Sequence, residues 1–198
     1  MLNLNAFAKE IHENAKAHGF WDEPRPFDEL CALMISELAE ALEEAREGRP
    51  MEWYACKCSR EGKEPCDEQK CLLEGRHWKS CGALDQKPEG IAVEMADCAI
   101  RILDYLGYKG YSIDEGPQIR PEDYKALPYA FMKVCMHIVD AHEHEDIGMD
   151  EVYEVWALER ALSVILHWFT ANALDFEAIA RRKHEYNKTR SIRHGKLF

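Results

Sequence analysis

The sequence lacks a long apolar run. No stretch of about 18 or more apolar residues occurs, which argues against a membrane-spanning helix. The amino terminus has no long apolar core of the kind that a secretory signal carries, so we expect a cytoplasmic protein that does not bind membranes. With 198 residues, 46% of them hydrophobic and 31% charged, the chain can bury one core, and any second domain would have to be small.

Basic residues are also scarce. The chain has 25 Lys and Arg residues against 37 Asp and Glu residues, which gives a net charge of −12. Affinity for the phosphate backbone of DNA or RNA comes chiefly from Lys and Arg, so this balance argues against a nucleic-acid polymer as the partner. A small phosphate ligand remains compatible with it, provided that metal ions screen the charge.

Apolar residues recur at helical spacing along most of the chain and predict an all-α fold, a single domain (1–198) built as a bundle of about six helices. The predicted helices are Asn5–His18, Phe27–Arg46, Ile91–Leu106, Tyr124–Glu145, Asp150–Ala173 and Asp175–Arg190. Gly19 and Gly107 are the predicted stops of the first and third helices, and a linker is expected from Tyr108 to Pro121.

Two predicted helices each carry a pair of acidic residues three positions apart, Glu37 with Glu40 and Glu94 with Asp97. Residues at this spacing lie one turn apart on the same side of a helix. If the pairs face each other they form a cage of four carboxylates, which are ligands that Mg²⁺ prefers. The alternative is a solvated acidic face, in which Asp97 forms an ordinary surface pair with Arg101.

The pattern E-x-x-E followed by E-x-x-D lies in three ordered blocks, FDELCALMISELAEALEE, KPEGIAVEMADCAIRILDYLG and KHEYNKTRSIRHGKLF. Together they resemble the MazG-like members of the all-α nucleoside triphosphate pyrophosphohydrolases. The resemblance covers about half of the chain. A cysteine-bearing insert between the acidic pairs and an added segment from about Arg120 to Trp168 depart from the short family members.

The resemblance implies a MazG-like fold and Mg²⁺-dependent hydrolysis of a nucleoside triphosphate between its α and β phosphates, a house-cleaning reaction of nucleotide metabolism. Glu37, Glu40, Glu94 and Asp97 would hold Mg²⁺, for which Mn²⁺ can substitute, and Glu40 or Glu37 would also orient or deprotonate the attacking water. The base and the sugar remain open. The rival interpretations are a non-catalytic helical nucleotide sensor and a zinc-containing interaction module.

The last predicted helix is basic on one side. Lys183, Asn187 and Arg190 share one of its faces and could point together at a phosphate, as the resemblance favours. The alternative is a helix carboxy terminus that cations stabilise. Trp21, in the turn before the second helix, is a candidate wall for stacking on the base or, alternatively, a buried anchor of that turn.

The insert, residues 48–88, has little apolar periodicity and many charges, so it cannot bury a core of its own. It contains Cys56, Cys58, Cys66, Cys71 and Cys81, with His77. These residues could bind a structural Zn²⁺. They lack the paired C-x-x-C spacing of standard zinc sites, so free thiols remain the alternative. Cys31, Cys98 and Cys135 fall within helical apolar patterns and are expected in the core.

The segment 122–173 has the character of a degenerate repeat of the first helical pair. At an offset of one hundred residues, His137 aligns with Glu37 and Asp140 with Glu40. A repeat predicts a pseudo-dimeric monomer, whereas two unrelated amphipathic helices leave an ordinary homodimer open. A further metal site could be formed by His137, Asp140, His142 and His144; the alternative is a set of surface histidines near a helix end.

Overall fold

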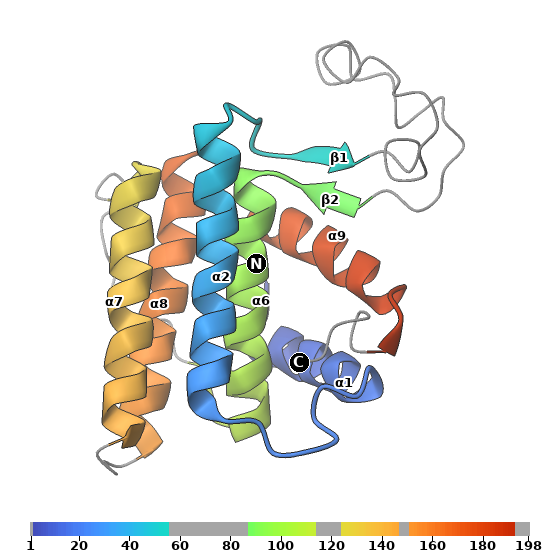
Figure 1. Cartoon of the computed structure of the whole chain (residues 1–198), viewed down its shortest axis with the longest axis vertical. Coiled ribbons are helices and arrows are strands. Elements are labelled where there is room, and N and C mark those ends of the chain that lie inside the picture. The colour runs from blue at the N-terminus through green and yellow to red at the C-terminus, as the bar shows by residue number, and fades with distance from the viewer. Residues whose placement is uncertain (1, 56–86, 114–123, 147–150, 193–198) are drawn as a thin grey trace.

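Four long helices stand side by side in the computed structural model, which describes residues 2–55, 87–113, 124–146 and 151–192 (Figure 1). They are α2 (Phe27–Arg46), α6 (Ile91–Lys109), α7 (Leu127–Asp146) and α8 (Glu151–Ala171). Helix α2 packs on α6 and α7, and α8 packs on the same two helices, so the four form a closed bundle. The prediction of an all-α bundle is confirmed for the described residues.

Two shorter helices, α1 (Leu4–Ala17) and α9 (Phe176–Lys188), pack on α6. In Figure 1 they lie on the side of α6 away from α7. Helix α6 is therefore covered from several directions, and its residues are buried almost around its circumference, including Glu94. No helix among the described residues has the length and apolar content needed to cross a membrane.

The predicted stop of helix α6 at Gly107 is wrong. The helix continues to Lys109 and ends before Gly110, whose φ of 70° is left-handed. The predicted linker therefore begins later than Tyr108. Gly107 has another role, because a Cβ atom at this position would lie 2.6 Å from the carbonyl oxygen of Ala8 in α1. Only glycine lets the two helices approach this closely.

We expect Gly107→Ala to lower the free energy of unfolding by about 1–3 kcal/mol, because the added methyl group would force α1 away from α6. At an open helical position the same change would instead stabilise by roughly 1 kcal/mol. Urea denaturation followed by circular dichroism measures the difference. A more stable variant would show that the contact between α1 and α6 is looser than described.

A short antiparallel ribbon joins the insert to the bundle. Strand β1 (Trp53–Ala55) pairs with β2 (Lys87–Glu89), and Trp53 stands opposite Glu89. Gly90 follows at a φ of +115°, and a Cβ atom there would lie 2.8 Å from the carbonyl oxygen of Met51, so the ribbon leads tightly into α6. The ribbon was not predicted. The five cysteines and His77 of the proposed zinc site lie outside the described residues.

The α7–α8 pair completes the bundle that α2 and α6 begin. At the offset of one hundred residues, Leu30, Met34, Leu38 and Ala41 of α2 align with four residues of α7, and all eight are buried. The four α7 residues are Ala130, Val134, Ile138 and Ala141. This agreement fits a repeat, but two unrelated amphipathic helices facing one core would share the same spacing, so the repeat stays a prediction.

Candidate functional site

Three carboxylates from the two predicted acidic helices converge in the interior. One oxygen from each of Glu37, Glu94 and Asp97 lies within 4.8 Å of the others. Glu37 is 5% exposed and Glu94 is 2% exposed, so these charges are removed from bulk water. Glu37 is buried because it lies beside Leu38 and Met34 on the face of α2 that packs on the core. We call these three residues the carboxylate cluster.

Glu40 stands outside the cluster and is exposed. Three residues turn an α-helix by about 300°, so side chains at this spacing point in directions about 60° apart. On α2 this rotation carries Glu40 from the interior to solvent. The predicted cage of four carboxylates is therefore a cluster of three, with Glu40 close enough for its charge to act on Glu37.

Two cations already neutralise the cluster. The Lys183 Nζ atom lies 3.1 Å from Asp97 Oδ2 and 3.5 Å from Glu94 Oε2, and Lys183 is 1% exposed. The prediction that Lys183 faces a phosphate is corrected here, because the packing of α9 on α6 turns this side chain into the cluster. Arg101 likewise does not form the surface pair with Asp97 considered above. Its Nη2 and Nε atoms lie 2.6 and 2.7 Å from Glu37 Oε1.

The protonation of the cluster follows from burial and charge. Burial, reinforced by the neighbouring carboxylates, raises the pKa of Glu94 to about 9, although Lys183 opposes the shift. Burial and the charge of Asp97 likewise raise the pKa of Glu37. Burial alone would raise the pKa of Asp97, but Lys183 and Arg101 outweigh it and hold that pKa below its usual value. At neutral pH, Glu94 thus keeps a proton and Asp97 is ionised.

The residues of the cluster fit a hard divalent cation. Three carboxylates offer the oxygen ligands that Mg²⁺ and Mn²⁺ prefer, with room in the usual coordination for waters and substrate oxygens. The Oε1 atom of Glu94 is buried and has no hydrogen-bond partner among the described residues. A buried carboxylate oxygen without a partner is costly, and a bound cation would satisfy it.

A pocket opens beside the cluster. It runs along α6 from Asp97 and Arg101 to Asp104, and α1, α9 and the turn between α1 and α2 form its other walls. The twelve residues that line it are Ile11, Asn14, Ala15, Phe20, Arg25, Asp97, Ile100, Arg101, Asp104, His184, Asn187 and Arg190. The empty space within the pocket and its open mouth is about 590 Å³, which includes open solvent.

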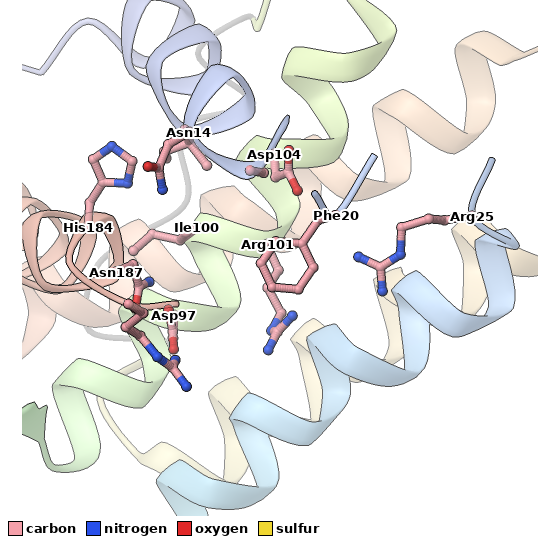
Figure 2. A pocket seen from close by; sticks show the side chains of 12 residues that line it. Asn14, Phe20, Arg25, Asp97, Ile100, Arg101, Asp104, His184 and Asn187 are labelled. Carbon is pink, nitrogen blue, oxygen red and sulfur yellow. The ribbon is translucent and has the colours of Figure 1, made fainter. Parts of the chain in front are cut away.

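The two ends of the pocket differ in chemistry. Figure 2 shows Asn14, His184 and Asn187 at one end, and Phe20 and Arg25 at the other. The Asn187 side chain is largely buried, and its Oδ1 atom has no hydrogen-bond partner among the described residues. The prediction that Asn187 and Arg190 face one site agrees with their place in the pocket wall.

Trp21 does not line the pocket. Its Nε1 atom donates to both carboxylate oxygens of Asp104 at 3.1 Å, and its ring stacks on Tyr108 with the ring centroids 4.4 Å apart. The structure therefore places Trp21 as the anchor of the turn, the alternative to a wall for the base. The aromatic side chain in the pocket is its neighbour Phe20.

The histidine-rich end of α7 does not gather into a second metal site. Among the described residues, the carboxylate cluster is the only group in which three or more His, Cys, Asp or Glu side chains converge. The His137 Nδ1 atom lies 3.7 Å from Asp140 Oδ2, as an ordinary pair three residues apart. Cys31 and Cys98 are buried in the core, as predicted, and Cys135 is half-buried against it.

Several pocket residues were not predicted from the sequence. Arg101 and Asp104 follow Asp97 at spacings of four and seven residues, so they continue the face of α6 that carries the acidic pair. That periodicity was a usable signal. Phe20 and Arg25 lie in a turn rather than in a periodic segment, and no such signal marks them. Comparison of the chain with protein-family models, with curated proteins and with solved structures finds no match.

The affinity of the cluster for Mg²⁺ should increase with pH. A metal ion binds the ionised carboxylate, so the proton held by Glu94 must leave first. We expect affinity to rise by up to about tenfold per pH unit between pH 6 and 9, and to level off above the Glu94 pKa of about 9. Titration calorimetry in two buffers of different ionisation enthalpy measures the released proton. Glu94→Gln is the control and should flatten the profile; a flat wild-type profile would contradict the assignment.

Proposed function

We propose that the protein is a Mg²⁺-dependent nucleoside triphosphate pyrophosphohydrolase of the MazG-like type. The observation that carries the proposal is the junction of two features: a buried carboxylate cluster with an unsatisfied oxygen, and a pocket lined by three arginines. Carboxylates attract a divalent cation, whereas arginines attract phosphate oxygens. A ligand that needs both is a polyphosphate carried as its metal complex.

In this proposal, water attacks the α-phosphorus and the bond from that phosphorus to the α,β-bridging oxygen breaks. The products are a nucleoside monophosphate, pyrophosphate and a proton. Glu37, Glu94 and Asp97 would hold Mg²⁺, which when bound screens the phosphate charge and polarises the attacked phosphorus. Arg101 and Arg190 neutralise the phosphate oxygens as negative charge moves onto the leaving pyrophosphate.

Arg190 is the arginine most available to a ligand, because no described residue forms an ion pair with its guanidinium. Arg25 is paired with Glu29, and Arg101 with Glu37. Glu40 is exposed to solvent and close enough to the cluster for its charge to act on Glu37, and we assign it the orientation and deprotonation of the attacking water. The buried carboxylates are less suited to this role, because Glu94 keeps its proton at neutral pH.

Phe20 and the far end of the pocket would take the nucleoside. An aromatic ring offers a face on which any base can stack, so the position of Phe20 fits this part of the ligand without identifying the base. The Phe20 ring also packs beside the guanidinium of Arg25, whose Cζ atom lies 5.8 Å from the ring centroid. This contact restricts both side chains to the pocket wall.

The second candidate is a nucleotide sensor without turnover. It is favoured by the ion pairs of Lys183 and Arg101, because a cluster that these two cations already neutralise is stable without a metal. A sensor would bind nucleotides through the pocket and leave them intact.

The direct test is to incubate the protein with Mg²⁺ or Mn²⁺ and a panel of ribo- and deoxyribonucleoside triphosphates, and to follow the products by phosphorus NMR. We expect pyrophosphate and monophosphates. Inorganic phosphate with diphosphates would indicate another class of phosphohydrolase. Calorimetry on the same panel completes the test, because binding without turnover would identify the sensor.

A further inference from the structure

Helix α7 carries an exposed apolar stripe on the side opposite its buried residues. Tyr129, Met132, Met136 and Val139 are 47%, 63%, 42% and 45% exposed. Their spacing of three, four and three residues places them along one line of the helix, and it is the spacing of a coiled-coil seam. We call these four residues the outer α7 stripe.

As far as the described residues show, the stripe is not needed for the packing of α7. The opposite side of the helix supplies the contacts with α2 and α8, through the buried residues from Ala130 to Ala141. The neighbouring helix α8 adds Tyr153 and Trp156, which are 46% and 49% exposed. Exposed apolar side chains gathered on one helix face are typical of a protein–protein contact.

Charges beside the stripe indicate which partner it fits. Lys133 and Asp140 are seven residues apart and therefore flank the stripe on the same edge, with opposite signs. When two copies of one helix pair in antiparallel orientation, each edge meets the same edge of the other copy. A two-fold axis near Met136 would then place Lys133 of each copy beside Asp140 of the other. Parallel pairing would instead set each edge against the opposite edge of the other copy, so that Lys133 and Asp140 would not meet.

We propose that the outer α7 stripe is the seam of a symmetric dimer, in which α7 pairs antiparallel with α7 of a second copy. Both charged side chains are available for the contact. Lys133 extends over the Tyr129 ring, 5.7 Å from its centroid, and within the described part of the chain Asp140 pairs with His137, at 3.7 Å. The dimer is isologous, so one set of residues builds both halves of the interface.

This inference is independent of the proposed function. The carboxylate cluster and its pocket lie where α6 meets α1, α2 and α9, whereas the stripe lies on α7, across the bundle from α1 and α9 (Figure 1). Nothing in the dimer requires a nucleotide or a metal ion. The test of pyrophosphohydrolase activity can therefore fail while the test of the dimer succeeds, and the reverse also holds.

Sedimentation velocity of the full chain over concentrations from about 1 to 100 µM tests the proposal. We expect the mass of two chains at the higher concentrations. The double substitution Met132→Glu with Met136→Glu should raise the dissociation constant at least about tenfold. The matched control is Tyr111→Glu, at a residue that is 40% exposed outside the stripe, which should leave the dimer unchanged. Circular dichroism confirms that each variant is folded.

A charge exchange tests the antiparallel arrangement. Lys133→Glu and Asp140→Lys should each weaken the dimer, and the two together should restore it, because the exchanged charges again attract across the axis. A monomer at every concentration, or a dimer indifferent to the methionine substitutions, would overturn the proposal. So would single charge variants that the double variant fails to rescue, or a chain that stays monomeric and instead binds lipid vesicles.

Discussion

Asp97→Asn is expected to reduce pyrophosphate release by at least about three orders of magnitude while the helical circular dichroism stays unchanged. The amide keeps the size of the side chain but removes the charge that would hold Mg²⁺. It also removes the ion pair with Lys183, whose Nζ atom lies 3.1 Å from Asp97 Oδ2. The rate should be measured at saturating nucleotide and at several Mg²⁺ concentrations, so that lost metal affinity is separated from lost turnover.

Two further variants control this experiment. Glu43→Gln removes a carboxylate from the exposed face of α2, where it pairs with Arg46, and should leave the rate within about twofold. Glu40→Gln should lower turnover at unchanged Mg²⁺ affinity, since Glu40 stands outside the cluster. An Asp97→Asn enzyme with a near-normal rate would remove the cluster from the mechanism.

Lys183→Met is expected to destabilise the metal-free protein by about 3–5 kcal/mol, because it leaves Asp97 ionised in the interior, beside Glu94, without the ammonium group of Lys183. The loss should be smaller in Mg²⁺, since a metal ion bound to these carboxylates takes over part of the compensation. Mg²⁺ should therefore raise the unfolding temperature of the variant more than that of the wild type. Chemical denaturation in a chelator and in excess Mg²⁺ gives both quantities.

Lys188→Met is the matched control, five residues along the same helix. Lys188 is exposed and paired with Glu10 and Glu185, so its removal should cost no more than about 1 kcal/mol, with no dependence on Mg²⁺. If Mg²⁺ stabilises the Lys183→Met variant no more than the wild type, the cluster does not bind the metal in the manner proposed.

The helices were the most predictable part of the fold. The stripe of Leu30, Met34 and Leu38 has a helical period, and α2 begins and ends at the predicted residues. Glu37 lies beside this stripe in the sequence, and the structure buries its side chain against the core. Periodicity reports which residues share a face, and for one helix this is enough.

Periodicity does not report which helix will cover a face. Glu37 and Arg101 lie 64 residues apart, and Lys183 lies 89 residues from Glu94, so their pairing is decided by how α2 and α9 pack on α6. The role of Gly107 depended on the same information. Its sequence context is that of a helix stop, and only the approach of Ala8 shows that it is a packing position.

Because the β1–β2 ribbon holds both ends of the insert together, the length of the insert does not affect the geometry of the carboxylate cluster. The chain leaves at Ala55 and returns at Lys87, and these two residues are paired neighbours. Such strand ends can be bridged by a tight turn of two residues or by a much longer excursion, and the entropic cost of closing a loop grows only slowly with its length. An affinity tag or a fluorescent reporter can therefore be spliced between them without moving the helices that bear Glu37 and Glu94.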